Sequence, residues 1–212
     1  VWTGSTNLTT NCFYKNNNNS LAVKSDFLAR NYTNEFQEMF VDKKFGPRSP
    51  SNNPYPTVTV GEATISVYFA PEDKIGAKLK EEINKARLSI DVMAFVFTSV
   101  ELAKALSDFH KRGADARVLL EKRNAASSAS QDEALVMQGI RVYYDANRDI
   151  MHNKVMILDG ETVITGSYNF TAAADTTNDE NLLIVKSKRI SELYKAEFLK
   201  LLEDAEPLTL AE

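Results

Sequence analysis

The first forty residues of this chain recur near its C-terminal end, and this repeat limits the folds that the chain can adopt. The segment 1–40 aligns without a gap on the segment 163–202, so corresponding residues lie 162 positions apart. The identical pairs include Gly4 and Gly166, Ser5 and Ser167, Asn7 and Asn169, Asn19 and Asn181, and Tyr32 and Tyr194. A repeated segment marks a repeated structural unit. We therefore expect residues 1–45 to be the C-terminal part of a first module that begins upstream of Val1.

A proline-rich segment separates the two copies. GPRSPSNNPYP, residues 46–56, contains four of the six prolines. Proline disfavours helix and lacks the N–H that a sheet ladder needs, so an extended linker is predicted here. The second copy ends a longer region, and residues 57–206 are expected to form a complete second module.

The apolar patterns of this second region alternate between those of strands and those of helices. Helices are predicted at 73–86, 99–113, 130–139 and 190–205, and strands at 58–71, 88–97, 116–122, 140–145, 152–160, 162–167 and 181–187. The run LSIDVMAFVF is apolar at nearly every position, which is typical of a strand covered on both faces. The alternation predicts an α/β fold, an α-β-α sandwich with a central mixed β-sheet.

The composition excludes several classes of protein. Hydrophobic residues make up 43% and charged residues 25% of the chain, as in soluble globular proteins, and no apolar run approaches the roughly 20 residues of a membrane span. The net charge of −4 argues against a protein that coats nucleic acid through bulk positive charge. The single Cys12 excludes an intramolecular disulfide and a thiolate zinc cluster.

Two residues of the segment MHNKVMILDG have side chains suited to phosphate chemistry. On a strand, residues two positions apart share a face, so His152 and Lys154 are predicted to project together. A lysine ammonium suits a phosphate oxygen, and an imidazole can act as nucleophile or as general acid and base near neutral pH. Lys154 also disfavours a second positive charge on His152, which keeps the imidazole neutral.

A Gly-Ser-x-Asn turn follows the predicted hairpin. Ser167 and Asn169 offer a hydroxyl and an amide to the remaining oxygens of a phosphoryl group, and Gly166 lets the backbone approach closely. The same pattern occurs at Gly4 in the other copy, which favours a functional role over a solvated surface turn.

Together these residues resemble the HxKxxxxDxxxxxxGSxN signature of the phospholipase D superfamily. The matching residues are His152, Lys154, Asp159, Gly166, Ser167 and Asn169. The resemblance covers about residues 57–204, and residues 1–40 resemble the end of a partner module in members with two motifs. It implies a phospholipase D-like fold and a metal-independent phosphodiesterase that needs no cofactor.

The resemblance also implies how the site works. His152 would belong to a pair of histidines, of which one attacks phosphorus to form a phosphohistidine while the other protonates the leaving alcohol and then activates water. Lys154 and Asn169 would bind the phosphoryl oxygens, with support from Ser167. Glu180 matches the acidic residue that hydrogen-bonds to a catalytic imidazole and fixes its tautomer.

Asp159 belongs to the signature, and we include it among the catalytic candidates. Its place at the predicted hairpin turn favours a structural role over a reactive one.

The second histidine of such a pair is missing from this sequence. His110, near a predicted helix end, is interpreted as a partner of the helix dipole or a surface residue. Ser5 and Asn7 are expected to line the first half-site as substrate-binding residues, and Asn18 stands where the second copy has Glu180. We expect the second HxK motif from an upstream module of the same protein or, alternatively, from a homodimer.

Nucleic acid is the preferred phosphodiester substrate. The ending GSYNFTAAADTTNDENLLIV is most similar to the bacterial endonuclease-like branch, and the predicted loops RNAASSASQD and DANRDI are polar, whereas a phospholipase is expected to offer apolar loops near its site. Residues that could contact a phosphate chain or stack on bases are Lys122, Arg123, Tyr143, Tyr144, Tyr168 and Phe170, although some of these aromatic residues must be core.

Other interpretations stay open. One is a phospholipase D that hydrolyses phospholipid headgroups, and another is a catalytically silent module that binds phosphate-containing ligands or a protein partner. A third is a transferase similar to cardiolipin or phosphatidylserine synthases. The Asn-rich KNNNNS segment is expected to be a polar loop, and its composition is compatible with an exported bacterial enzyme.

Overall fold

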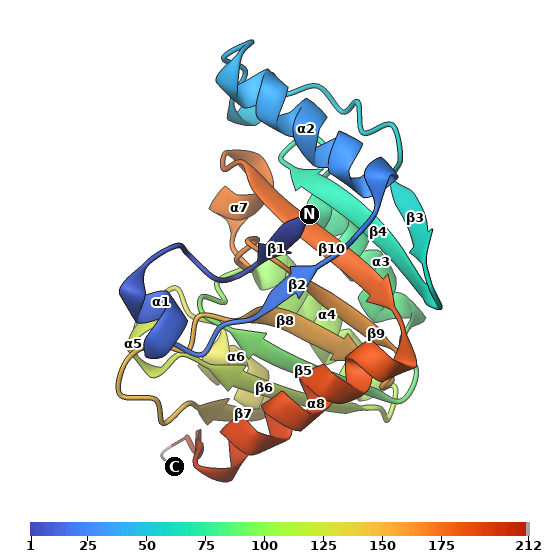
Figure 1. Cartoon of the computed structure of the whole chain (residues 1–212). Helices are drawn as coiled ribbons and strands as arrows, with labels where there is room; N and C mark the ends of the chain where they lie inside the picture. Colours follow the sequence, from blue (N-terminus) through green and yellow to red (C-terminus); the bar gives the residue numbers. More distant parts are fainter. Residues whose placement is uncertain (211–212) are drawn as a thin grey trace.

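A large mixed sheet forms the centre of the protein (Figure 1). The computed structural model describes residues 1–210, and within them nine strands form one sheet in the order β11-β7-β6-β5-β8-β9-β10-β4-β3. These strands are β3 (Thr57–Val60), β4 (Ala63–Ala70), β5 (Ser89–Ala94), β6 (Asp115–Leu120), β7 (Arg141–Tyr144), β8 (Lys154–Leu158), β9 (Thr162–Gly166), β10 (Glu180–Lys186) and β11 (Glu206–Pro207). The neighbours β5, β6 and β7 run parallel, and the other neighbours pair antiparallel.

Six helices of the same region connect or cover these strands. They are α3 (Ile75–Lys85), α4 (Val100–Lys111), α5 (Lys122–Ala125), α6 (Asp132–Met137), α7 (Ala172–Thr176) and α8 (Lys188–Glu203). Helices α3, α4, α6 and α8 confirm the four predicted helices, with ends that differ by a few residues. Helices α5 and α7 are too short to give a periodic apolar pattern, and the sequence did not predict them.

Both faces of the sheet are buried. On β5, Val92 packs in a core with Leu79 of α3 and Leu106 of α4, while the next residue, Met93, packs in a separate core with Phe198 of α8. Successive strand residues point to opposite faces, so a strand in the middle of this sandwich must be apolar at every position. The predicted α/β sandwich with a central mixed sheet is confirmed.

The N-terminal residues form a small unit that lies against this module. Strands β1 (Trp2–Gly4) and β2 (Ser20–Ala22) pair antiparallel, and two helices follow them in turn, α1 (Thr10–Tyr14) and α2 (Asp26–Phe40). Strand β1 contacts β9 of the large sheet, and α2 lies beside β4 and β10 (Figure 1). The ring of Tyr32 on α2 meets that of Phe69 on β4 edge to face, with centroids 5.2 Å apart.

The repeated residues make matching hydrogen bonds across this contact. In each copy an asparagine Oδ1 accepts one bond from a threonine and one from a tyrosine of the other copy. Asn181 accepts from Thr3 at 2.6 Å and Tyr32 at 3.0 Å, and Asn19 accepts from Thr165 at 2.7 Å and Tyr194 at 3.0 Å. The two copies are therefore related by a local pseudo-twofold arrangement.

The connecting residues 46–56 are less extended than predicted. Gly46–Arg48 forms a 3-10 turn, η1, and the rest has no regular structure up to β3. The side chain of Asn31 bonds both the N–H and the carbonyl of Tyr55, and Asn53 donates to the carbonyl of Val67 at 2.9 Å. These bonds hold the connection against the module, so it does not act as a free spacer.

None of the helices within residues 1–210 has the length and apolar character needed to cross a membrane.

Candidate active site

The signature residues gather where three neighbouring strands end. Strand β8 begins at Lys154 and β9 ends at Gly166, and the antiparallel register pairs Val155 with Thr165 and Leu182 with Gly166. The start of β8, the end of β9 and the start of β10 therefore lie at the same end of the sheet. This end brings together His152, Lys154, Gly166, Ser167, Asn169 and Glu180.

His152 precedes β8 and contacts the N-terminal unit. The predicted strand 152–160 is two residues too long at its start, because the N–H of His152 donates to the carbonyl of Asn17 instead of to a neighbouring strand of the large sheet. The ring Nδ1 lies 2.9 Å from the carbonyl oxygen of Ser5 and 3.2 Å from Oδ1 of Asn18. Both neighbours accept hydrogen bonds, so Nδ1 carries the proton and Nε2 keeps its lone pair.

Lys154 is almost fully buried beside this imidazole. It is 4% exposed, its Nζ donates to the carbonyl of His152 at 2.9 Å, and it lies 4.7 Å from the centroid of the Phe95 ring. Burial lowers the pKa of Lys154 to about 7, against the opposing attraction of the Glu180 carboxylate. An anion bound at this end of the sheet would oppose that effect and favour the ammonium.

His152 itself has a weakened affinity for protons. Burial lowers its pKa and so does the nearby charge of Lys154, while the bond to Ser5 acts in the opposite direction. Its ring contacts Phe95 with centroids 4.6 Å apart. Because Lys154 contacts the same ring, the two side chains lie on one side, as predicted.

The Gly-Ser-x-Asn turn provides polar groups next to this pair. The Oγ of Ser167 accepts two bonds from Asn181, at 3.0 Å from N and 3.2 Å from Nδ2, so its own proton can be given to a ligand. The Oδ1 of Asn169 is buried without a partner, and rotating the amide would place an NH₂ donor at that position.

Gly166 allows close packing of the backbone. A Cβ at this residue would lie 2.1 Å from the carbonyl oxygen of Asn181, which no side chain could tolerate without movement of the backbone. The absence of a side chain at Gly166 therefore lets the backbone of the turn lie close to the backbone of β10.

Asp159 does not join the site. It lies in the turn between β8 and β9, at the opposite end of the hairpin from Lys154. Its carboxylate accepts hydrogen bonds from the N–H groups of Arg87, Leu88 and Ser89 at 2.7–3.2 Å. The full length of β8 separates it from His152, and these hydrogen bonds fit the structural role that its place at the turn favours.

Glu180 does not contact His152. Its Oε1 accepts from Asn178 at 3.2 Å, and the position beside the imidazole is taken by Asn18, the counterpart of Glu180 in the first copy. By the local symmetry, Glu180 occupies in the second copy the position that Asn18 occupies in the first.

The N-terminal candidates have different environments. Ser5 is buried and offers its carbonyl oxygen to His152, while its Oγ accepts from Asn19 at 3.1 Å, as Ser167 does from Asn181. Asn7 is exposed, and its carbonyl accepts from the N–H of Thr9.

Sequence analysis missed two residues of the site. Asn18 sits in the KNNNNS segment, which is a loop as predicted but one whose side chains reach the second module. Phe95, which packs against both His152 and Lys154, looked like one more apolar residue of a buried strand. The alignment of Asn18 with Glu180 in the repeat was the one signal in the sequence that pointed to Asn18. No pattern in the sequence pointed to Phe95.

The residues proposed for nucleic-acid contact have other partners. Tyr168 and Phe170 are buried, at 2% and 1% exposure, so they cannot stack on bases. Lys122 forms an ion pair with Glu206 at 2.6 Å. The guanidinium of Arg123 donates to the carbonyl of Arg148 at 2.6 Å, and the hydroxyl of Tyr144 donates to Asp132.

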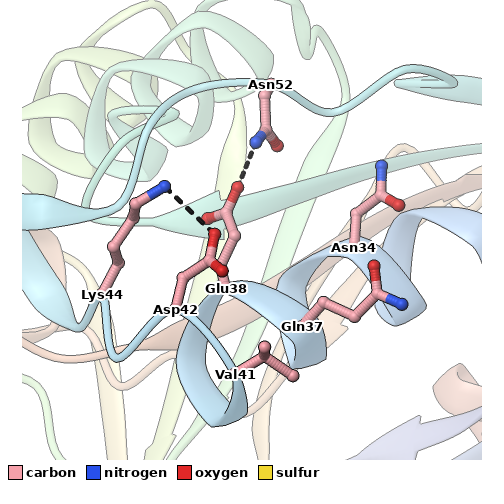
Figure 2. Close-up of a pocket in the computed structure, with 7 residues that line it drawn as sticks. All are labelled: Asn34, Gln37, Glu38, Val41, Asp42, Lys44 and Asn52. Carbon is pink, nitrogen blue, oxygen red and sulfur yellow. Dashed lines mark hydrogen bonds and ion pairs between the residues drawn. The ribbon is translucent and has the colours of Figure 1, made fainter.

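A cavity of about 470 Å³ opens at α2, away from the signature residues (Figure 2). Its lining consists of Asn34, Gln37, Glu38, Val41, Asp42, Lys44 and Asn52. Glu38 accepts from Asn52 and Lys44 pairs with Asp42, so polar groups of the wall bond one another. Within residues 1–210, no group of three or more His, Cys, Asp or Glu residues is arranged to hold a metal ion, here or at the signature residues.

Comparison with known proteins identifies the family. A family model described as "Cardiolipin synthase, PLD-like domain" matches residues 79–202. The chain belongs to the phospholipase D superfamily. It is 31% identical to a phospholipase D of Rickettsia felis, over 77% of this chain and 82% of that protein, and 34% identical to the mitochondrial cardiolipin hydrolase of Xenopus laevis, over 65% of each.

Two solved structures have the same fold as this chain. The family member Nuc from Salmonella typhimurium matches with a TM-score of 0.65 and 30% identity, over 70% of this chain and all of Nuc. The phosphatidylserine synthase of Haemophilus influenzae matches with a TM-score of 0.71 over 92% of this chain and 57% of that one, and at 12% identity this shows the fold alone. The predicted family is confirmed, and with it the enzyme class, hydrolases that act on phosphodiester bonds.

Proposed function

We propose that this phosphodiesterase is a metal-independent nuclease that acts on DNA or RNA through a phosphohistidine intermediate. The observation that carries the proposal is the pairing of His152, with its Nε2 lone pair free, and the buried Lys154 at one end of the sheet. In a buried site the attraction between an ammonium and a phosphate is stronger than in water. The pair thus favours binding of a phosphodiester anion next to an imidazole that can react.

Each neighbouring group has a part in the proposed reaction. Lys154 attracts the anion, and the Ser167 hydroxyl and the Asn169 amide donate to its phosphoryl oxygens. One histidine of the pair forms a bond to phosphorus as the bond to the leaving oxygen breaks, and the other gives that oxygen a proton. The second histidine then takes a proton from water, whose oxygen displaces the imidazole from phosphorus.

The loops around His152 favour a polar polymer over a lipid. The loop after β6 and the loop 145–150 lie at the same end of the sheet as His152, and the side chain of Asn147 bonds Asn17 next to it. The exposed residues of the first loop are polar or small, such as Ser127 and Ser128. A lipid surface would be better matched by large apolar side chains here.

Hydrolysis assays test the proposal. The natural protein and its His152→Asn variant are incubated in EDTA with single-stranded DNA, double-stranded DNA, RNA and vesicles of phosphatidylcholine or cardiolipin. We expect cleavage of nucleic acid that the variant lacks, and a ³²P label that stays on the protein after an alkaline quench and is released by acid, as a phosphorus–nitrogen bond to histidine requires. Release of headgroups without cleavage of nucleic acid would show that the substrate is a phospholipid. Hydrolysis that persists in the His152→Asn variant would refute the role of His152.

We also propose that residues 1–45 are the end of a first module, which supplies the second HxK half-site. Three exposed side chains of this unit correspond to core residues of the second module: Trp2 to Ile164, Leu8 to Phe170 and Phe36 to Phe198. The first three are 60%, 83% and 55% exposed, while their counterparts are at most 1% exposed. Such positions are apolar because a complete module would cover them.

The homodimer alternative receives less support. The unit 1–45 already occupies, through Thr3 and Tyr32, the surface around Asn181 that a second copy of the complete module would have to use. A comparison of two samples distinguishes the two sources of the second HxK motif: the chain 1–212 alone, and the same chain mixed with a separate polypeptide that carries the upstream HxK motif. We expect hydrolysis only in the mixture, and a chain that is fully active as a monomer of residues 1–212 would refute the need for a second half-site.

A further inference from the structure

The two copies differ in charge at one position that faces a site imidazole. Their hydrogen bonds match closely, for example at Ser5 with Asn19 and at Ser167 with Asn181. Asn18, however, is an amide where its counterpart Glu180 is a carboxylate. A side chain that departs from an otherwise preserved symmetry makes the two half-sites chemically unequal.

The orientation of the Asn18 amide is set by its other contacts. Its Nδ2 donates to the carbonyl of Cys12 at 2.8 Å, which turns Oδ1 toward Nδ1 of His152 at 3.2 Å. The Oγ of Ser5 also reaches this oxygen, at 3.5 Å. The amide therefore acts as an acceptor toward the imidazole, and together with the Ser5 carbonyl it requires a proton on Nδ1.

We propose that Asn18 is a positioning residue that holds His152 with Nδ1 protonated and the Nε2 lone pair free, without the negative charge that would stabilise an imidazolium. Lys154 on β8 is the titratable group that acts on His152, and Cys12 on α1 and Glu180 at the start of β10 act in turn on Lys154. Lys154 acts on His152 directly and opposes its protonation, and burial acts in the same sense. A neutral amide adds no charge against these effects, so only the hydrogen bond to Ser5 opposes them, whereas a carboxylate at residue 18 would offset them further.

This inequality assigns different parts to the two half-sites, and this step rests on the proposed hydrolysis. The imidazole that bonds to phosphorus gains positive charge, which a carboxylate partner stabilises. The imidazole that gives its Nε2 proton to the leaving oxygen loses positive charge, which a neutral partner and Lys154 favour. His152 is thus the proton donor in the first step, for which Nε2 must first take a proton from solvent, and in its neutral Nδ1–H form it is the base toward water in the second. The bond to phosphorus forms in the half-site that contains Glu180.

Imidazole NMR on the full chain tests the role of Asn18 without a substrate. Long-range ¹H–¹⁵N spectra of wild type, Asn18→Asp and Asn18→Ala are recorded as a function of pH. We expect the Nδ1–H tautomer for wild-type His152, a titration midpoint about one to two pH units higher in Asn18→Asp, and more of the Nε2–H tautomer in Asn18→Ala. His110, whose Nδ1 contacts the carbonyl of Ala114, serves as the internal reference.

Two results would overturn the inference. If neither variant changes the tautomer or the midpoint of His152, Asn18 does not position it. If the midpoint rises in Asn18→Asp but the alkaline limb of kcat/KM against pH stays in place, His152 is not the proton donor. The spectra need no hydrolysis, so a failure of the proposed function is distinguishable from a failure of the role of Asn18.

Discussion

Replacing Lys154 by methionine is expected to stabilise the fold at the same time as it abolishes hydrolysis. The side chain is 4% exposed, and no carboxylate forms an ion pair with it within residues 1–210. Its pKa falls from an ordinary value of 10.5 to about 7 in the folded protein. Methionine has a similar shape and carries no charge, so the variant avoids the cost of burying an ammonium.

The size of the gain follows from the pKa difference. Between pH 7 and 10.5 the unfolded chain binds more protons at this residue than the folded one, so wild-type stability rises with pH in that window. At about 1.4 kcal/mol per pKa unit, the charge costs the folded state about 5 kcal/mol at pH 6 and about 2 kcal/mol at pH 9. Lost contacts with His152 and Phe95 reduce the gain equally at both values. The advantage of the variant should therefore shrink by about 3 kcal/mol from pH 6 to pH 9.

Urea denaturation at the two pH values measures this difference. Lys188→Met, at an exposed position on α8, is the matched control and should show no such trend. An advantage of Lys154→Met that is the same at pH 6 and pH 9, or a variant less stable than wild type at pH 6, would refute the interpretation that Lys154 is a buried charge held for function.

Three further substitutions test other features. Asp159→Asn keeps the side-chain size but removes the negative charge that accepts from the N–H groups of Arg87, Leu88 and Ser89. It should lower the free energy of thermal unfolding by about 2 kcal/mol and leave hydrolysis intact below the melting temperature. A loss of kcat with an unchanged Tm would instead support a catalytic role for Asp159. Gly166→Ala should lower the free energy of unfolding by about 3 kcal/mol, because its Cβ would meet the Asn181 carbonyl. The control Gly113→Ala, with φ 87° and no atom within 4 Å of its Cβ, should lower it by about 1 kcal/mol. Equal losses in the two variants would contradict the close approach of Gly166 to Asn181. Burial and the nearby Glu72 raise the pKa of Glu35 to about 8, so wild-type stability should fall as pH rises from about 4.5 to 8, and Glu35→Gln should gain more in Tm at pH 8 than at pH 5.

The fold and the placing of His152 beside Lys154 could be predicted from the sequence because both depend on local patterns. A nearly continuous apolar run placed β5, a helical pattern placed α4, and the fixed spacing of the signature placed His152 beside Lys154. Prediction from the sequence failed where a contact joins distant segments. The Nδ1 partners of His152 are Ser5 and Asn18, more than 130 positions away, and the register between the two copies depends on tertiary packing. Tyr168 and Phe170 were ambiguous because an aromatic residue on a strand can serve the core or a ligand, and burial decides between them.

The carriage of both copies in one polypeptide has an evolutionary consequence. In a symmetric dimer one codon specifies the residue beside both imidazoles, so any substitution there changes the two half-sites together. In this chain positions 18 and 180 are separate codons, and selection can act on each alone. Asn19 and Asn181 are identical, and each accepts hydrogen bonds from a threonine and a tyrosine of the other copy, so the contact between the copies uses both. One position further upstream, the two copies were free to diverge, and a duplicated motif could become a pair of specialised halves.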